Sequence, residues 1–410
     1  MVIHLEIIII FFTELKMSRT VGTVARGIRC PIVQEGDDIV EIVVEALKNA
    51  WRKEGFEIRD RDVVGITESI VARAQGNYVT LDDIASEIRN RFGDEVGVVF
   101  PILSRNRFAM ILKGIAAGAR QVHLLLSYPS DEVGNQLMDI EKMDELDIDP
   151  SSRILTEEEF RELFGYHKHE FTGIDYIDYY KEQGTGDNIK VILSNNPADI
   201  LSFTKNVLVA DIHSRHRTKR LLEKAGAETV FSLDDICCTP RADAGYNEEC
   251  GLLGANKATE DKIKLFPRDG HSVVEGIQKR IKEITGKDIE VMIYGDGAFK
   301  DPRGKIWELA DPVVSPAFTP GLNGTPSEIK LKYFADNRFA GMKGEEINRA
   351  MKESIRAKGD DLVGKIEAQG TTPRQLTDLL GSLCDLISGS GDKGTPIILI
   401  QGYFDNYASD

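Results

Sequence analysis

Charged and small residues crowd the segment YGDGAFKDPRGKIWELADP, which follows an apolar run that predicts a buried strand over residues 289–293. The segment holds an aspartate between two glycines, and then a lysine and an arginine: Gly295, Asp296, Gly297, Lys300 and Arg303. The glycines would let a metal-bound phosphate approach the backbone. The two cations could neutralise charge transferred in a reaction. The alternative interpretation is a turn of a particular type that binds nothing.

Two more carboxylates lie in loops that flank predicted strands. Glu68 stands in GITESIVARAQGNYV, and Asp261 in YNEECGLLGANKATEDKIKLFP. Hard divalent ions take oxygen ligands and are often shared with substrate phosphates. Asp261, Asp296 and Glu68 could therefore form a carboxylate cage for Mg²⁺ or Mn²⁺. The alternatives are an ordinary strand-to-helix turn for the first segment and a plain glycine-rich connection for the second.

The same two segments carry further polar and small residues that could bind a ligand: Ser69, Arg73, Gly254, Asn256 and Lys257. The chain contains no GxxxxGK sequence followed by Ser or Thr. Any nucleotide must therefore be held by an architecture other than a P-loop.

A fourth polar segment, VADIHSRHRTKR, places Asp211 and His213 at the end of a predicted strand and four basic residues in the helix that follows. It could form a rim that attracts phosphate. A solvated basic helix face is the other interpretation.

The composition limits the classes of function. The 410 residues carry a net charge of -16, which argues against general nucleic-acid binding, because such proteins need clustered positive charge. The apolar run over residues 7–12 is far shorter than the roughly 20 residues of a bilayer span. Five cysteines without a CxxC pair favour buried or free thiols over a zinc site. We expect a cytoplasmic protein with small-molecule substrates, no nucleic-acid partner and no membrane partner.

Strand and helix patterns alternate along the first half of the chain. Apolar runs predict strands over 61–67, 96–100, 122–126, 190–194 and 207–211, and helical spacing predicts helices over 39–51, 108–119, 215–226 and 271–285. After residue 319 the pattern is mostly helical and ends in a strand, TPIILIQGYF. The predicted fold class is α/β (α+β) with mixed sheets.

Four segments, taken in order, resemble the coenzyme F-420-0 γ-glutamyl ligase family. They are PIVQEGDDIVEIVVEAL, RDVVGITESIVARAQGNYV, the asparagine-containing glycine loop, and ITGKDIEVMIYGDGAF. The resemblance covers about half of the chain, mainly its first hundred residues and residues 246–315. The first two segments match the family in residue type and spacing, and the last two match it less closely.

The resemblance implies a two-domain fold that forms a homodimer, and GTP-dependent amide ligation with divalent metal ions and often a potassium ion. In this reaction an acyl phosphate forms on a substrate carboxylate, and L-glutamate then attacks it. The resemblance assigns metal binding to Asp296 and Asp261, and it matches Glu68, Ser69 and Arg73 to one family motif. We expect Glu68 to act in catalysis together with the two cations named above, Lys300 and Arg303. The resemblance also matches Asp37 and Asp38 to a GDD sequence of the family. We expect these two to bind ligand together with the residues named above: Ser69, Arg73, Gly254, Asn256, Lys257, Gly295 and Gly297.

The chain also departs from the family pattern. It has a long insertion over about residues 105–243 and a helical C-terminal extension, and Ala298 stands near the place of a family threonine. These departures leave the acceptor open between F-420-0, a folate-like compound and another carboxylate. A metal-dependent phosphotransferase or nucleotidase and a non-catalytic nucleotide-binding protein remain as alternatives.

The predicted division has four parts. Residues 1–16 form an extension that is non-native or flexible, and 17–242 form an α/β region with the long insertion. Residues 243–330 form the metal and nucleotide region, and 331–410 a helical region with a final strand.

Overall fold

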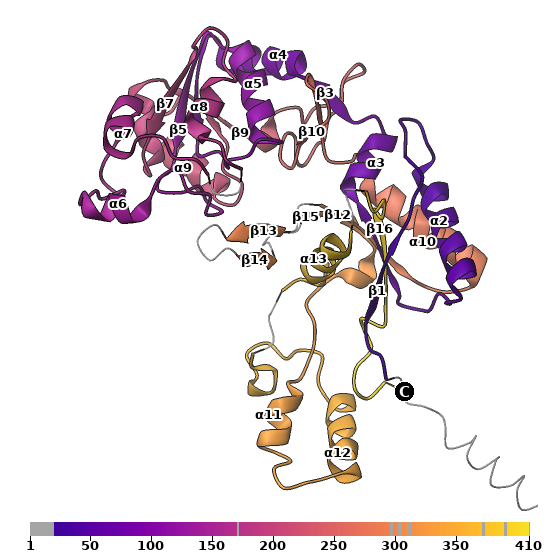
Figure 1. The fold of residues 1–410 in the computed structure, drawn as a ribbon. Coiled ribbons are helices and arrows are strands. Elements are labelled where there is room, and N and C mark those ends of the chain that lie inside the picture. The colour runs from indigo at the N-terminus through magenta and orange to yellow at the C-terminus, as the bar shows by residue number, and fades with distance from the viewer. Residues whose placement is uncertain are drawn as a thin grey trace, which may run out of the picture.

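The computed structural model describes residues 20–169, 172–295, 298–301, 306–309, 314–370, 374–388 and 392–409; the side chains of 298–301, 306–309 and 314 are not described. The predicted extension over residues 1–16 therefore lies outside the described part of the chain. In Figure 1 the described chain forms two large lobes, each built around one sheet, and a smaller helical lobe with α11 and α12.

One large lobe contains a five-stranded mixed sheet. Its strands, in spatial order, are β1 (Val24–Ile28), β16 (Ile397–Gln401), β2 (Val63–Thr67), β12 (Glu290–Gly295) and β15 (Val314–Phe318). The strands β2 and β12 run parallel, whereas the other neighbours are antiparallel. The last strand of the chain thus lies between two of its first strands.

Helices cover both faces of this sheet. On one face lie α2 (Ile39–Glu54) and α10 (Gly270–Thr285), whose apolar residues form one core with strands β2 and β12. On the other face lies α13 (Leu376–Ile387), packed against Val63, Met292 and Ile398. The Asp38 side chain caps the start of α2 by accepting a hydrogen bond from Glu41 N, which satisfies one backbone donor of the first turn.

A small antiparallel sheet lies between the two large lobes (Figure 1). Its strands are β10 (Asn256–Lys257), β11 (Lys262–Lys264) and β3 (Tyr78–Thr80). The short helix α3 (Glu68–Ala74) leads from β2 towards β3, and α4 (Leu81–Phe92) follows β3. A capping box of Thr80 and Asp83 starts α4.

The other large lobe contains a six-stranded sheet. In spatial order its strands are β6 (Leu155–Thr156), β7 (Ile189–Leu193), β5 (Gln121–Leu126), β4 (Glu95–Val99), β8 (Asn206–Val209) and β9 (Thr229–Ser232). All neighbours except β6 and β7 are parallel. The chain starts at β4, winds outward through β5 and β7, and then returns to β8 on the other side of β4. This is the order of a doubly wound sheet.

The six-stranded sheet is also covered on both faces. The helices α5 (Phe108–Gly118) and α8 (Tyr176–Lys181) pack into the larger core, and α9 (Arg215–Ala225) packs against the opposite face through Leu222. The shorter helices α6 (Ile140–Glu145) and α7 (Glu157–Phe164) lie in the connection between β5 and β7.

The C-terminal part contributes α11 (Leu331–Asp336) and α12 (Glu345–Arg356), which share a small core around Phe334 and Met351. A hairpin of β13 (Ala298–Asp301) and β14 (Ile306–Leu309) extends from the region after β12 (Figure 1).

The α/β class with mixed sheets is confirmed, as are the predicted strands and helices named above, with ends that shift by a few residues. The four-part division stays a prediction. Within the described residues, no helix is both long enough and apolar enough to cross a bilayer.

Candidate functional site

The parallel strands β2 and β12 bring two of the predicted site segments to one edge of the five-stranded sheet. Their register pairs Tyr294 with Thr67, so both strands reach their carboxyl ends at the same level. Glu68 follows β2 directly, and Gly295 is the last residue of β12. In open α/β sheets such an edge is the usual place for a ligand.

Glu68 and Gly295 are in close contact. A Cβ atom on Gly295 would lie 2.5 Å from Cγ of Glu68, so no larger residue fits without moving this side chain. Glu68 is only 6% exposed, which is unusual for a carboxylate. The glycine predicted to admit a phosphate therefore also makes room for a buried acid.

Ser69 follows Glu68 in the first turn of α3 and accepts a hydrogen bond from Nζ of Lys264 in β11. Lys264 faces Asn256 on one side and Tyr78 on the other in the register of the small sheet. Directly opposed residues share one face of a sheet. The structure therefore adds a lysine to the site that the sequence analysis missed.

The sequence did contain a signal for Lys264. In KIKLFP, lysines alternate with the apolar residues Ile263 and Leu265, both of which are buried. A period of two places both lysines of the run on the face opposite the core.

Two polar side chains fix α3 and the small sheet to each other. The buried amide of Asn77 donates to the carbonyl oxygens of Phe266 at 2.6 Å and Tyr246 at 3.0 Å. Gln75 exchanges two hydrogen bonds with the backbone of Arg268. Gln75 and Asn77 lie between α3 and β3, so their hydrogen bonds hold this connection in place. They thereby fix Ser69 of α3 relative to Lys264 of β11.

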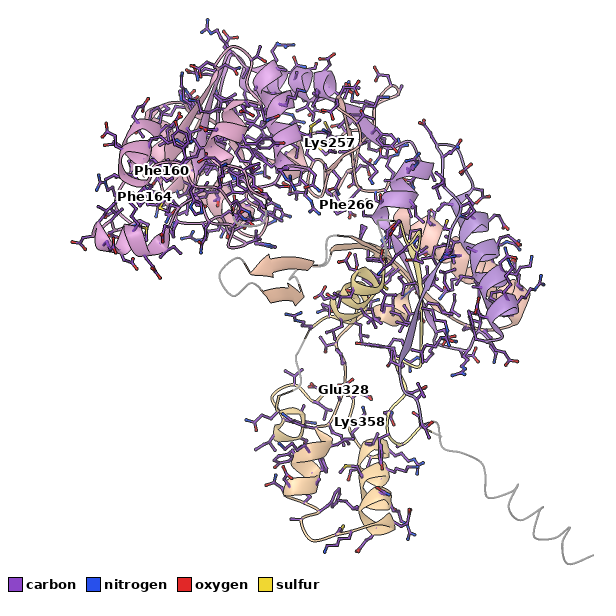
Figure 2. All side chains as sticks on the ribbon, viewed as in Figure 1. Phe160, Phe164, Lys257, Phe266, Glu328 and Lys358 are labelled. Carbon is purple, nitrogen blue, oxygen red and sulfur yellow. The ribbon has the colours of Figure 1, made fainter. Side chains whose placement is uncertain are left out.

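The glycine loop has mixed roles. Gly254 has a φ of +69°, and a Cβ there would lie 2.2 Å from the Phe266 ring, so a glycine is required for packing. Asn256 shares the face of Lys264, as described above. Lys257 instead forms a 2.5 Å ion pair with Glu260, which is exposed. Figure 2 labels Lys257 and Phe266 in the region between the two large lobes.

Asp261 lies in the exposed turn before β11. Its carboxylate accepts a 2.6 Å hydrogen bond from the Thr259 hydroxyl, which lowers the pKa of Asp261 below its usual range. Its carbonyl oxygen accepts from Leu81 N and so anchors the start of α4. These contacts do not bring the Asp261 carboxylate to Glu68.

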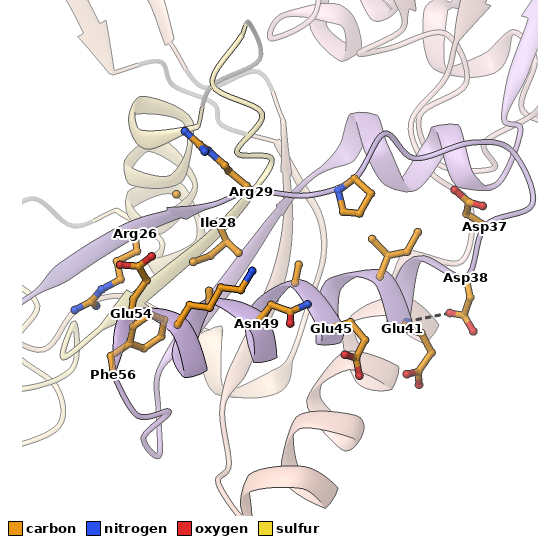
Figure 3. A pocket seen from close by; sticks show the side chains of 16 residues that line it. Arg26, Ile28, Arg29, Asp37, Asp38, Glu41, Glu45, Asn49, Glu54 and Phe56 are labelled. Atoms are coloured by element: carbon orange, nitrogen blue, oxygen red, sulfur yellow. Dashed lines mark hydrogen bonds between the residues drawn. The ribbon is translucent and has the colours of Figure 1, made fainter.

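Asp37 and Asp38 line one end of a groove of about 1150 Å³ between β1 and α2 (Figure 3). Asp37 accepts a hydrogen bond from Gln34 N and so closes a turn, while Asp38 caps α2. Both carboxylates thus have local backbone partners. The same loop reaches the α3 region, because Gly36 N donates to the carbonyl oxygen of Ala74 and the Glu35 side chain lies against Gly76.

The remaining predicted residues are either exposed or not fully described by the structure. Arg73 lies on the exposed side of α3. Asp296, Gly297 and Arg303 lie outside the described residues, and Lys300 is described only through its backbone, which pairs with Trp307 in the β13–β14 hairpin. Over the part of the chain that is described, no three His, Cys, Asp or Glu residues gather to hold a metal. The predicted cage around Asp296 therefore stays a prediction.

The fold and this site define an α/β protein with a buried carboxylate and a lysine beside the carboxyl ends of two parallel strands. Residues 27–402 match the family model described as F420-0:Gamma-glutamyl ligase. The chain belongs to this family.

Curated relatives match over a shorter stretch. The chain is 33% identical over 81 residues to the coenzyme F420:L-glutamate ligase of Methanothermobacter thermautotrophicus, which is 18% of this chain and 31% of that protein. It is 32% identical over 84 residues to the protein of the same name from Methanosarcina acetivorans, covering 19% and 30% of the two chains. The match thus spans about a third of the length of these relatives, which are shorter than this chain.

Proposed function

We propose that this protein is a γ-glutamyl ligase that joins L-glutamate to the carboxylate of a coenzyme, with GTP as the phosphate donor. The family membership supports the class of reaction. The observation that carries the assignment to this site is the contact of buried Glu68 with Gly295. Gly295 directly precedes Asp296 in the chain, so this contact supports a site that contains both acids.

The residues at this edge suit a divalent metal ion. Glu68 offers carboxylate oxygens, Gly295 leaves space beside them, and Asp296 follows directly in the chain. A bound Mg²⁺ or Mn²⁺ would supply charge neutralisation for the transferred phosphate. We propose that Glu68 and Asp296 hold this ion. Metal binding by Asp261 stays a prediction, because its exposed carboxylate is hydrogen-bonded to Thr259.

The proposed reaction has two steps. A carboxylate oxygen of the acceptor attacks the γ-phosphorus of GTP, forming an acyl phosphate as GDP leaves. The amine of L-glutamate, after loss of its proton, attacks the acyl carbon, and inorganic phosphate leaves as the amide forms. Such chemistry depends on positioning and charge neutralisation more than on a nucleophilic side chain.

Lys264 is suited to a positioning and electrostatic role in both steps. Its ammonium group contacts Ser69, the residue next to Glu68, and it is held in a strand. A fixed positive charge stabilises phosphate oxygens without reorganising during the reaction. We propose that Lys264 binds the phosphate groups, together with Asn256 on the same face of the small sheet.

The test is release of phosphate by the full chain with Mg²⁺ or Mn²⁺, with GTP and ATP in parallel. Each nucleotide is given with and without L-glutamate and with a panel containing F-420-0, a folate and simple carboxylates. Release that requires both glutamate and one acceptor, with an amide product seen by mass spectrometry, supports the ligase. Nucleotide turnover that is indifferent to glutamate would contradict it and favour a phosphotransferase.

A further inference from the structure

The six-stranded sheet has a switch point in its strand order, in the lobe away from the Glu68 site. From β4 the chain adds strands on one side through β5 and β7, and then on the other side with β8 and β9, so the strand order reverses between the parallel neighbours β4 and β8. The connections after these strands run to opposite faces, towards α5 and towards α9. A crevice forms at such a point outside the carboxyl ends of the strands, and ligands of doubly wound folds bind there.

A buried carboxylate with an unused oxygen lies at this point. Asp211 follows β8 and is only 2% exposed. Its Oδ2 accepts a 3.0 Å hydrogen bond from Thr218 in α9, whereas its Oδ1 has no hydrogen-bond partner among the described residues. Buried polar atoms are nearly always satisfied in proteins, so an unsatisfied carboxylate oxygen indicates a missing partner.

A second carboxylate reaches the same point from the other side of β4. Glu132, in the loop after β5, accepts hydrogen bonds from the backbone nitrogens of Ile212 at 2.6 Å and His213 at 3.1 Å. Burial raises the pKa of Asp211 to about 6, and the nearby charge of Glu132 adds to this rise. The two acids are therefore held near each other although their charges repel.

The adjoining helix end is suited to an anion. The side chain of Ser214 makes no capping hydrogen bond at the start of α9, and the exposed side chains of His216 and Arg217 follow in its first turn. Helix N-termini attract phosphate through their backbone N–H groups and dipole. Arg215 turns away to a 2.9 Å ion pair with Asp234.

The crevice is also not completely filled from the α5 side. A cavity of about 60 Å³ is lined in part by Ile102 and Phe108, which come after β4, and by Ala210 and Ile212, which come after β8. These residues flank the same two strand ends.

We propose that this edge binds a phosphorylated small molecule together with a divalent cation. Asp211 and Glu132 would hold the cation, and the start of α9 with His216 and Arg217 would receive the phosphate. Mg²⁺ commonly binds through one or two carboxylates and completes its shell with water and ligand phosphate. This arrangement supplies the partner that Asp211 Oδ1 lacks, and it gives the basic start of α9 a role.

The test uses the full chain with Mn²⁺ and inorganic phosphate as probes. Crystals grown with both should show an anomalous peak between Asp211 and Glu132. In solution, Mn²⁺ titration followed by electron paramagnetic resonance should show one bound ion fewer, or at least tenfold weaker binding, in Asp211→Asn. Running the titration in an Asp296→Ala background keeps the ion of the proposed ligase site out of the count.

Asp187→Asn is the matched control. Asp187 is 68% exposed and pairs with Lys190 just before β7, at the opposite edge of the same sheet. Its substitution should leave Mn²⁺ binding unchanged. If Asp211→Asn fails to fold, Glu132→Gln decides instead, because Glu132 is on the surface. An absence of Mn²⁺ at this edge in the unmutated protein would overturn the proposal. So would Mn²⁺ binding by Asp211→Asn or Glu132→Gln that equals binding by the unmutated protein.

Discussion

The molecule contains two edges where parallel strands end beside acidic residues, and the two edges are built differently. At the end of β2 and β12, Glu68 lies against a glycine, and a lysine from a separate small sheet contacts the neighbouring serine. At the end of β4 and β8, Asp211 lies beneath a helix, and Glu132 crosses over from the next loop. The first edge joins segments far apart in the sequence, whereas the second is formed within one doubly wound unit.

The two edges show that the ends of parallel strands can bring polar residues together at two separate places in one chain. The carboxyl ends of parallel strands meet at one level, so the residues that follow them come together whatever the sequence of the strands. The edge near Glu68 carries segments with family resemblance. At the edge near Asp211 the sequence analysis predicted only a basic segment that could attract phosphate, and the strand order shows that this segment follows a switch point of the sheet. The predictions below test whether the two edges are functionally separate.

The largest effect is expected at the first edge, from Asp296→Ala. Loss of this carboxylate should lower the ligation rate by about 10²–10³-fold or more, because charge stabilisation of the transferred phosphate is lost. The rate of amide formation checks this, with circular dichroism to show that the fold is intact. Retained activity in Asp296→Ala would contradict the assignment of the site. As the control, Asp187→Asn in the other lobe should leave the ligation rate unchanged.

Gly295→Ala should follow in size. The added Cβ would lie 2.5 Å from Cγ of Glu68 and would push this carboxylate aside. Displacement of a reacting group by about 1 Å can lower a rate by about 10²-fold. The measurement is kcat for ligation together with the melting temperature.

Gly22→Ala is the control for that change, because no atom lies within 4 Å of a Cβ at this position. Normal ligation by Gly295→Ala would mean that the position of Glu68 does not matter for the reaction.

Lys264→Met should lower ligation by about tenfold or more, since it removes one charge-assisted contact of about 1.5–3 kcal/mol. The methionine side chain is unbranched and only one atom shorter, so the strand should remain intact. A rise in KM for GTP with little change for glutamate would support phosphate binding. An unchanged KM for the nucleotide would contradict that role.

The smallest effect is on the stability of the second lobe. The pKa of Asp211 in the folded chain is about 6, above the roughly 3.9 of an unfolded aspartate. The folded state therefore gains stability from protonation below about pH 4 and loses it as the pH rises towards 6. Without divalent cations, Asp211→Asn should be more stable than the parent at pH 7, by on the order of 2 kcal/mol, and no more stable at pH 4.

Urea unfolding at the two pH values in the presence of a chelator measures this difference. Asp187→Asn is again the comparison, because the pKa of exposed Asp187 is lowered by its hydrogen bond with Lys190. A stability change in Asp211→Asn that is the same at both pH values would contradict the stated cause.

Local patterns were enough to predict much of the fold. The helices α2, α5, α9 and α10 carry apolar residues at helical spacing, and the strands β2, β4, β5, β7 and β8 are mostly apolar because both sheet faces are covered. The doubly wound order was not predicted, since apolar runs do not show which strands become neighbours.

Part of the candidate site was also within reach. Glu68, Ser69 and Gly295 were predicted from their places after strands, and the structure brings them together. Gly254 was predicted to bind a ligand, but its packing against Phe266 already requires a glycine. The predicted roles of Asp37 and Asp38 stay predictions beside their local capping contacts.

The residue patterns alone settle the α/β class, the family resemblance and the candidate acids, because periodicity and motifs depend on neighbours in the chain. The tertiary structure decided which of these residues meet. Lys264 reaches Ser69 across 195 positions, and Glu132 reaches Ile212 across 80. Such contacts depend on strand order and register, which follow from the packing of whole sheets and are not encoded in any one segment.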